Sequence, residues 1–392
     1  MPLVNDLDEA RLRDLAAARA TGDTVLSLFL DLDPERFATP RARKSEVDSL
    51  LDNAHALIER DTRPHPELIA LRDSLERARE ILAPPEESSE WAPQWAQGAH
   101  AVALFLSEPL NLEELLRLDV ALPSGVEIGD APAIAPLTLA EPAGEGTIVA
   151  LVDERSARFF RSSPQGLREA LVLEDDVHSR VKKGGWSQAR YERSQHEDVR
   201  QHLAHVGATL LETLRQVPYE RLLVACAQPL WSNLLTSLHP SVRERLAAPR
   251  LSLDVSDAGI ADVDHALEQA LEQQRERHEQ ERLDELQARI DRPADRRAAT
   301  GFPDVLQALV ERRVETLLHE FTLDGEGVAC ERCGWLGLEG ERCPLDGEPL
   351  RRSPNIVEDA VRAAVAQDAE VLALRDRPDL RPFDGIAALL RF

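Results

Sequence analysis

The segment KKGGWSQARY, residues 182–191, combines residue types that could carry out chemistry at the tip of a loop. Gly184 and Gly185 lack the Cβ atom that restricts backbone angles, so the main chain there can approach a ligand very closely. Gln188 follows three residues after Gly185. A glutamine cannot be a general base, because it does not titrate at physiological pH, but its amide can place a water molecule or stabilise an oxyanion. We therefore predict a catalytic loop formed by Gly184, Gly185 and Gln188, with the remaining catalytic groups supplied by a partner.

The surroundings of this loop are basic although the chain is strongly acidic. Residues 180–200 contain six basic and three acidic residues, whereas the whole chain has 46 Lys and Arg against 71 Asp and Glu, a formal charge of −25. That charge repels a polyanion at long range, which excludes general coating of nucleic acid and leaves a local contact. Trp186 could stack on a base, where aromatic platforms contribute about 1–3 kcal/mol, or pack against its own loop. The residues predicted to contact RNA are Arg180, Lys182, Lys183, Trp186, Arg190 and Arg193.

A second group with ligand chemistry lies near the C-terminal end of the sequence. Cys330, Cys333, Cys343 and Asp346 form the pattern C-x2-C-x9-C-x2-D. Two knuckles of this spacing can place four ligands around tetrahedral zinc, and four protein ligands leave no open position, so we predict a structural zinc site. The alternative is a loop that has lost its metal. Cysteines distributed in this way are not typical of a disulfide framework, and Cys226, in an apolar segment, is predicted to be a core residue.

Acidic residues and histidines flank the glycine-rich loop. Asp175, Asp176 and His178 could form an acid/base group beside it, but a turn rich in aspartate is the commoner reason for such a cluster. No metal-type spacing joins the nearby histidines to a carboxylate, so we expect them to be solvated or packed. These histidines are His178, His196, His202 and His205.

The elements that must position these residues are predicted to be strands alternating with helices, which indicates an α/β fold of three domains with mixed sheets flanked by helices. The first domain is expected over residues 1–141. Its helices are predicted at 6–20, 41–60 and 67–82, and its buried strands at 24–33 and 100–107. Residues 140–146, AEPAGEG, read as a linker because Gly and Pro interrupt both helices and strands.

The second and third domains are expected over residues 145–260 and 263–392. In the second, strands are predicted within 147–162, 221–229 and 251–255, and an amphipathic helix at 188–217. In the third, helices are predicted at 302–321 and 358–376, with a small zinc-ribbon-like insertion at 328–350. Residues 263–290 are expected to be a helix that bridges two domains, because its middle is polar on all sides.

The loop and its flanks resemble a known domain. The stretch GGWSQARYER, with VALVDERSARFF before it and RLLVACAQP after it, is similar to the middle domain of the archaeal and eukaryotic class-one translation release factors. That domain carries a Gly-Gly-Gln loop that enters the peptidyl transferase centre. Here Trp186 stands where that family has its glutamine. Gly185 to Gln188 instead resembles the Gly-x-x-Gln loop of the related peptidyl-tRNA hydrolases of ribosome quality control, and bacterial members of the superfamily are the closer match.

The resemblance extends to the C-terminal third and becomes weak in the first. Residues 301–318 and 358–374 are similar to helices of the release-factor third domain. True release factors read stop codons with an Asn-Ile-Lys-Ser loop in their first domain. ARKS, residues 42–45, shares two residues with that loop but lies on a predicted helix, so we regard it as chance. Absence of codon reading is what a factor acting on stalled ribosomes would show.

The resemblance implies a peptidyl-tRNA hydrolase that frees nascent chains from stalled ribosomes, with Gln188 positioning the nucleophile at the ester. The implied partners are the ribosome, with its large-subunit rRNA and peptidyl-tRNA, and a translational GTPase. Three alternatives stay open: cleavage of the tRNA near its 3′ end, occupation of an idle A site without catalysis, and reuse of the fold off the ribosome. No apolar run approaches the roughly 20 residues that cross a bilayer, and no targeting segment is evident. We therefore expect a cytoplasmic protein without a membrane partner.

Overall fold

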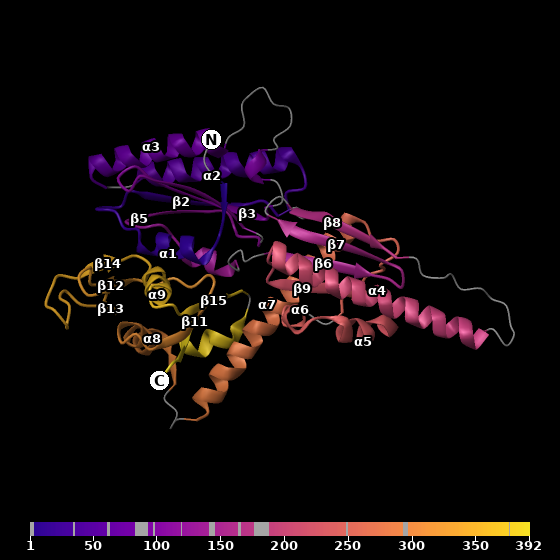
Figure 1. Cartoon of the computed structure of the whole chain (residues 1–392). Coiled ribbons are helices and arrows are strands. Elements are labelled where there is room, and N and C mark those ends of the chain that lie inside the picture. The colour runs from indigo at the N-terminus through magenta and orange to yellow at the C-terminus, as the bar shows by residue number, and fades with distance from the viewer. Residues whose placement is uncertain are drawn as a thin grey trace. The chain divides into compact units, whose positions relative to one another are not determined.

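The computed structural model describes residues 4–33, 36–60, 63–82, 93–96, 99–118, 120–140, 146–163, 166–175, 188–247, 250–292, 297–375 and 377–392. The chain forms two compact units (Figure 1). Unit 1 combines Met1–Pro142 with Glu279–Phe392, and unit 2 is Ala143–His278. The described part has mixed sheets flanked by helices, which confirms the predicted α/β class. The division of the chain into three domains stays a prediction.

The N-terminal part of unit 1 is a mixed sheet with helices packed against it. Its described strands have the order β1-β4-β3-β2-β5, in which only the β1–β4 pair is parallel. The strands are β1 (Val4–Asp6), β2 (Val25–Asp31), β3 (Ala101–Ser107), β4 (Leu112–Leu118) and β5 (Gly125–Gly129). The helices are α1 (Glu9–Ala17), α2 (Pro40–Arg60) and α3 (His65–Leu82), with 3₁₀ turns η1 (Gln94–Ala96) and η2 (Ala135–Leu139). The three helices predicted in this part are therefore confirmed.

Strand β2 is buried along its whole length because both faces of the sheet are covered. Side chains of a strand alternate between the two faces. Leu26 and Leu28 join a core with α2 and α3, which Figure 1 shows lying side by side over one face of the sheet. Phe29 points to the opposite face and belongs to a second core, which it shares with α8 and α9 of the C-terminal part.

The C-terminal part of unit 1 contains a second mixed sheet and a small antiparallel one. The described strands of the larger sheet have the order β10-β16-β11-β15. They are β10 (Ala298–Thr300), β11 (Val314–Glu320), β15 (Glu370–Leu374) and β16 (Ile386–Leu390), accompanied by α8 (Gly301–Val310), α9 (Ile356–Val365) and the 3₁₀ turn η3 (Pro378–Phe383). The small sheet, of order β13-β12-β14, is formed by β12 (Gly327–Ala329), β13 (Leu336–Gly337) and β14 (Arg351–Ser353).

The helices predicted at 302–321 and 358–376 are wrong in their second halves. Helix α8 ends at Val310, and Arg312 then adopts a φ of 57°, a left-handed conformation that interrupts a right-handed helix. The residues after it form β11, and its Val and Thr side chains suit a buried strand. Similarly, α9 ends at Val365, Asp368 has a φ of 54°, and the chain continues as β15.

Unit 2 is a sheet covered by helices on both faces. Its described strands have the order β8-β7-β6-β9, with β6 and β9 parallel. They are β6 (Thr147–Val152), β7 (Ser156–Ser163), β8 (Gly166–Glu174) and β9 (Arg221–Cys226), and the helices are α4 (Gln188–Gln216), α5 (Gln228–Ser237), α6 (Pro240–Arg243) and the first half of α7 (Ile260–Ile290). Leu203 and Val206 of α4 pack on one face, and Val263 and Leu267 of α7 on the other.

Two details of unit 2 differ from the sequence-based expectations. The strand predicted at 251–255 is wrong: it is reduced to a bridge between Leu251 and Ala225, because the Asp254 side chain accepts a hydrogen bond from the Ser256 backbone and makes a turn. Strand β8 was not predicted. The long helix at 188–217 is confirmed as α4, and Cys226 is buried in β9 as predicted.

Helix α7 contributes to the cores of both units. Val263 and Leu267 pack in unit 2, whereas Leu283 and Leu286 pack in unit 1 against Leu318 of β11. The boundary between the units, His278 to Glu279, falls inside the helix. Among the helices of the described ranges, none is both long and apolar enough to span a membrane.

Candidate functional site

The predicted loop is defined in the structure by its two ends. Gln188 is the first residue of α4. The other loop residues lie outside the described residues, as do the side chains of Gln188, Arg190 and Arg193. The loop residues that lie entirely outside the described residues are Arg180, Lys182, Lys183, Gly184, Gly185 and Trp186, and the same is true of Asp176 and His178. The catalytic and RNA-binding roles assigned to these residues stay predictions.

At the strand end of the loop, Asp175 is held from two sides. It directly follows β8, and its backbone N–H donates to the Arg155 carbonyl at 2.9 Å. Its carboxylate lies 2.7 Å from His202 Nδ1 and 3.1 Å from His205 Nδ1. These three residues, the Asp175–His202–His205 cluster, connect the end of β8 to one face of α4, since residues three apart in a helix lie on the same side.

Because Asp175 is ionised, the two histidines must be the hydrogen-bond donors in this cluster. Burial raises the pKa of Asp175, but hydrogen bonds from His202 and His205 outweigh this effect and hold the pKa below its ordinary value. An ionised carboxylate only accepts hydrogen bonds, so each histidine carries its proton on Nδ1. His202 is fully buried and His205 is 52% exposed. We expected packed or solvated histidines, and His202 is packed while His205 is partly solvated; the structure also pairs both with a carboxylate 27 or more residues away.

The predicted metal ligands are brought together by two matching turns. In the first, the Cys330 N–H donates to the Trp335 carbonyl at 2.8 Å and the Gly334 N–H donates to the Cys330 carbonyl at 2.9 Å. Gly334 has a φ of 75°, a conformation that favours glycine. This geometry turns Cys330 and Cys333 toward a common point.

The second turn repeats these bonds with an aspartate in place of the second cysteine. The Cys343 N–H donates to the Glu348 carbonyl at 2.8 Å, and the Gly347 N–H donates to the Cys343 carbonyl at 2.9 Å. Gly347 has a φ of 77°. Asp346 therefore occupies the position that Cys333 holds in the first turn.

The ligand atoms of these four residues all lie within 4.8 Å of one another. Cys333 Sγ is 3.4 Å from Cys343 Sγ, and Cys330 Sγ is 3.5 Å from an Asp346 carboxylate oxygen. Tetrahedral zinc with bonds of about 2.3 Å to sulfur and 2.1 Å to oxygen would separate its ligands by about 3.8 Å (S to S) and 3.6 Å (S to O). The side chains thus fit a zinc ion closely, and the Cys3Asp cluster could hold a metal.

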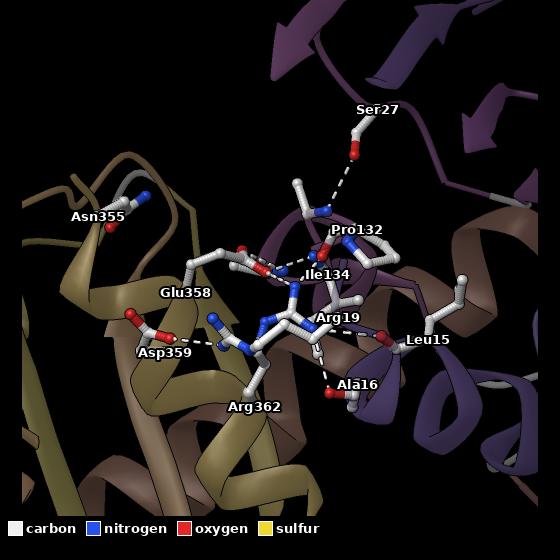
Figure 2. Close-up of polar contacts among 12 residues, drawn as sticks. Leu15, Ala16, Arg19, Ser27, Pro132, Ile134, Asn355, Glu358, Asp359 and Arg362 are labelled. Carbon is white, nitrogen blue, oxygen red and sulfur yellow. Dashed lines mark hydrogen bonds and ion pairs between the residues drawn. The ribbon is translucent and has the colours of Figure 1, made fainter. Parts of the chain in front are cut away.

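A buried ion pair that was not predicted from the sequence lies in unit 1, at the contact between α9 and the N-terminal part (Figure 2). Arg362 of α9 donates to the carbonyls of Leu15 and Ala16, at 3.2 and 3.1 Å, and to that of Pro132. The first two carbonyls lie in the last turn of α1, where the helix dipole places partial negative charge. A guanidinium therefore suits this position, although only 9% of its side chain is exposed.

Glu358 lies one helical turn before Arg362 and completes the pair. Its carboxylate accepts hydrogen bonds from the backbone N–H groups of Ile134 and Ala135, and lies 3.5 Å from Arg362. Burial raises the pKa of Glu358 to about 7, against the opposing effects of Arg362 and the two N–H donors. Desolvation also lowers the pKa of Arg362. Both charges are held by groups from the other part of unit 1.

Further ion pairs surround Glu358 and Arg362. Arg19 pairs with Asp130 and with Asp359, and Arg351 of β14 pairs with Asp359 at 2.8 Å. The pairs connect the N-terminal part, α9 and the small sheet that carries the metal ligands. We call Glu358, Arg362 and these four residues the Glu358–Arg362 network; it holds together two parts of unit 1 that are distant in sequence.

Comparison with known proteins identifies the central region. Residues 132–275 match the family model described as bacterial archaeo-eukaryotic release factor family 10. None of the curated proteins matches the chain. The chain is similar to the solved structure of archaeal translation termination factor aRF1, at 16% identity over 100% of this chain and 99% of that one, with a TM-score of 0.26.

Two other similar structures belong to related factors. One is a model of ribosome-bound archaeal Pelota and ABCE1, at 18% identity over 72% of this chain and 73% of that one, with a TM-score of 0.40. The other is S. cerevisiae Dom34, at 12% identity over 63% of each chain, with a TM-score of 0.37. Because these scores are low, the family model carries the assignment. Residues 132–275, fewer than half of the chain, are thus similar to bacterial archaeo-eukaryotic release factor family 10.

Proposed function

We propose that the protein is a ribosome-associated peptidyl-tRNA hydrolase that frees nascent chains from stalled ribosomes. The observation that carries the proposal is the sequence Gly-Gly-Trp-Ser-Gln at 184–188, which ends on the first residue of α4 within a segment that matches a release-factor family model. The long helix gives Gln188 a defined backbone position.

In this reaction Gln188 orients a water molecule toward the ester carbonyl that joins the peptide to the tRNA. The water oxygen bonds to the carbonyl carbon, the bond to the ribose oxygen breaks, and the proton that the water loses is passed to the ribose oxygen, which leaves a hydroxyl on the tRNA and a carboxylic acid on the peptide. Because an amide cannot accept a proton at neutral pH, the glutamine acts by positioning and hydrogen bonding, which can lower a barrier by several kcal/mol. The groups that transfer protons then belong to the ribosome or the tRNA.

The basic residues next to the loop serve the same function. Arg180, Lys182 and Lys183 would neutralise rRNA phosphates near the peptidyl transferase centre, a local contact that a chain of charge −25 needs in order to bind RNA. A translational GTPase is the further partner that the release-factor family suggests.

The Cys3Asp cluster has a structural role in this proposal. Cys330, Cys333, Cys343 and Asp346 would hold one zinc ion, which would supply a cross-link between the two turns of the small sheet. All four positions are filled by protein ligands, so the site takes no part in the hydrolysis.

The test is single-turnover release of labelled peptide from purified ribosomes stalled with peptidyl-tRNA in the P site. We expect Gln188→Ala to lose release while retaining ribosome binding, and Gln216→Ala, an exposed glutamine near the end of the same helix, to behave as wild type. Normal release by Gln188→Ala would refute the proposal. Binding without release by the wild type would identify a factor that only occupies the A site, and a shortened tRNA 3′ end would identify a nuclease.

A further inference from the structure

The Asp175–His202–His205 cluster lies where β8 ends and the loop segment begins. Twelve residues, 176–187, join Asp175 to Gln188, so this cluster is the last described point of attachment before the predicted loop. Asp175 is fixed there by its backbone bond to Arg155 as well as by the two histidines. The same three residues therefore fix the end of β8 relative to α4.

The cluster is too far from Gln188 to take part in the chemistry. His202 comes 14 residues after Gln188 in α4, which at a rise of about 1.5 Å per residue places it about 21 Å along the helix. A group at that distance cannot touch a substrate that contacts Gln188. The cluster can act on the reaction only through the position of the helix and of the chain leaving β8.

A metal-binding role for the cluster does not fit the distances. Within the described ranges, the cysteine cluster is the group of three or more possible ligands whose atoms lie within 4.8 Å of one another. The two histidine nitrogens lie 2.7 and 3.1 Å from the Asp175 carboxylate, which are ordinary hydrogen-bonding distances. The contacts are therefore hydrogen bonds to a carboxylate.

A purely structural role is also a poor account of His202. Its side chain is fully buried beside the core residues Leu203 and Val206, yet its Nε2 has no hydrogen-bond partner within the described part of the chain. A buried polar atom without a partner lowers stability, so an apolar side chain would suit this core better. What histidine adds is the Nδ1 hydrogen bond to Asp175.

Because the cluster lies far along α4 from Gln188, a small tilt of the helix at the cluster would displace Gln188 appreciably. The core residues of α4 at Leu203, Val206 and Leu210 lie beyond His202, and Figure 1 shows the N-terminal end of the helix extending past the sheet. A tilt of only about 3° at His202 would move Gln188 by about 1 Å over 21 Å, and a misplacement of that size can slow a reaction about a hundredfold.

We propose that Asp175, His202 and His205 position Gln188 by fastening the end of β8 to α4. This inference rests on the proposed function and identifies residues that orient the backbone of Gln188 at the start of α4. They are positioning residues, which act through the backbone that carries Gln188.

The first experiment measures single-turnover peptide release at increasing factor concentration, which separates the maximal rate from the half-saturating concentration. For Asp175→Ala and His205→Ala we expect the maximal rate to fall about tenfold to a hundredfold with little change in the half-saturating concentration. His205→Asn keeps a donor near the Nδ1 position and should restore most of the rate. His196→Ala, an exposed histidine on the same helix and nearer to Gln188, is the matched control and should match wild type.

A second variant separates positioning from folding. His202→Leu removes the unpaired Nε2 together with the Nδ1 hydrogen bond to Asp175, two opposing effects on stability, so the melting temperature should change little while the maximal rate of release falls as in Asp175→Ala. A rate that falls only in proportion to the folded fraction would overturn the inference.

A third measurement does not depend on activity. Hydrogen exchange of the backbone amides of residues 188–200 should be at least about fivefold faster in Asp175→Ala and His205→Ala than in wild type or His196→Ala, because the helix end would open more often. Unchanged exchange would overturn the inference even if the protein released no peptide. Loss of release in Gln188→Ala, together with normal release in both cluster variants, would overturn the inference and leave the proposed function standing.

Discussion

Replacement of Arg362 by methionine is expected to destabilise unit 1 by an amount that depends on pH. Methionine keeps most of the side-chain volume but removes the donors to the Leu15, Ala16 and Pro132 carbonyls. At pH 6 Glu358, whose pKa is about 7, is already mostly neutral and needs no cation. The cost there is that of the lost charged hydrogen bonds, about 2 kcal/mol in the free energy of unfolding.

At pH 8 the cost of the same substitution should be larger. Wild-type Glu358 is ionised there and is stabilised by Arg362 at 3.5 Å. Without the cation the carboxyl group must remain protonated about one pH unit above its wild-type pKa, which adds about 1.4 kcal/mol. The total of about 3–4 kcal/mol agrees with the usual cost of removing one member of a buried ion pair, about 3–5 kcal/mol.

The assay is hydrogen exchange of the amides of β3, a fully buried strand of unit 1, at pH 6 and pH 8 after correction for the intrinsic exchange rate. This measurement reports the opening of unit 1 separately from unit 2. Arg13→Met, which removes exposed pairs with Glu9 and Asp368, is the control and should cost at most about 1 kcal/mol. A cost for Arg362→Met below about 1 kcal/mol at both pH values, or a larger cost at pH 6 than at pH 8, would refute the reasoning.

Three further predictions concern other parts of the chain. Because the Glu358 pKa is raised from 4.5 to about 7, wild-type unit 1 should lose about 3 kcal/mol of stability as the pH rises from 4.5 through 7; Glu358→Gln should flatten this dependence in the same exchange measurement, and an equal slope in both proteins would contradict it. The chain should bind one equivalent of zinc in competition with a chromophoric chelator, more tightly in Asp346→Cys and more weakly in Asp346→Ala; identical affinities would rule out aspartate as a ligand. Gly207→Ala should lower the melting temperature, because the added Cβ would overlap the Ser237 carbonyl oxygen at the end of α5, and this overpacking of about 1–3 kcal/mol exceeds the usual helical gain of about 0.5–1 kcal/mol. A higher melting temperature would contradict this prediction and show that α5 moves to accommodate the Cβ.

The helices with one apolar face could be predicted from the sequence, and weakly patterned strands could not. Helices α2, α3 and α4 repeat apolar residues at helical spacing and end near the predicted positions. Strands β5 and β8 are half-buried or exposed along most of their length, so burial leaves little alternation in their sequences. The helix predicted at 302–321 was extended wrongly into β11, because the residue that ends it in a left-handed conformation is an arginine, Arg312, rather than a glycine or proline that the sequence would reveal.

Residues of the candidate sites could be predicted where they are neighbours in sequence. The cysteine pattern predicted four side chains that the structure brings together, because both turns are local. Asp175 and His202 are 27 residues apart, and Arg362 lies 347 residues from Leu15, so their contacts depend on how the chain folds back. The signal available for the first pair was two histidines, His202 and His205, three residues apart on the predicted helix.

Unit 1 is assembled from chain segments on both sides of unit 2, which has a consequence for biosynthesis. The sheet face that carries Phe29 and Phe105 is covered by α8 and α9, which are translated only after the whole of unit 2. During synthesis that face is exposed for the time needed to make more than a hundred residues, and unit 2, whose segment is continuous, is free to fold first.

The order in which the sheets of unit 1 form follows from the same division of its chain segments. Strand β16 lies between β10 and β11, so the larger sheet of unit 1 cannot close until Ile386–Leu390 is available. The Glu358–Arg362 network must form later than the N-terminal sheet that it joins. A chain interrupted before α8 would combine a folded unit 2 with an unfinished unit 1, a species suited to recognition by chaperones through its uncovered aromatic face.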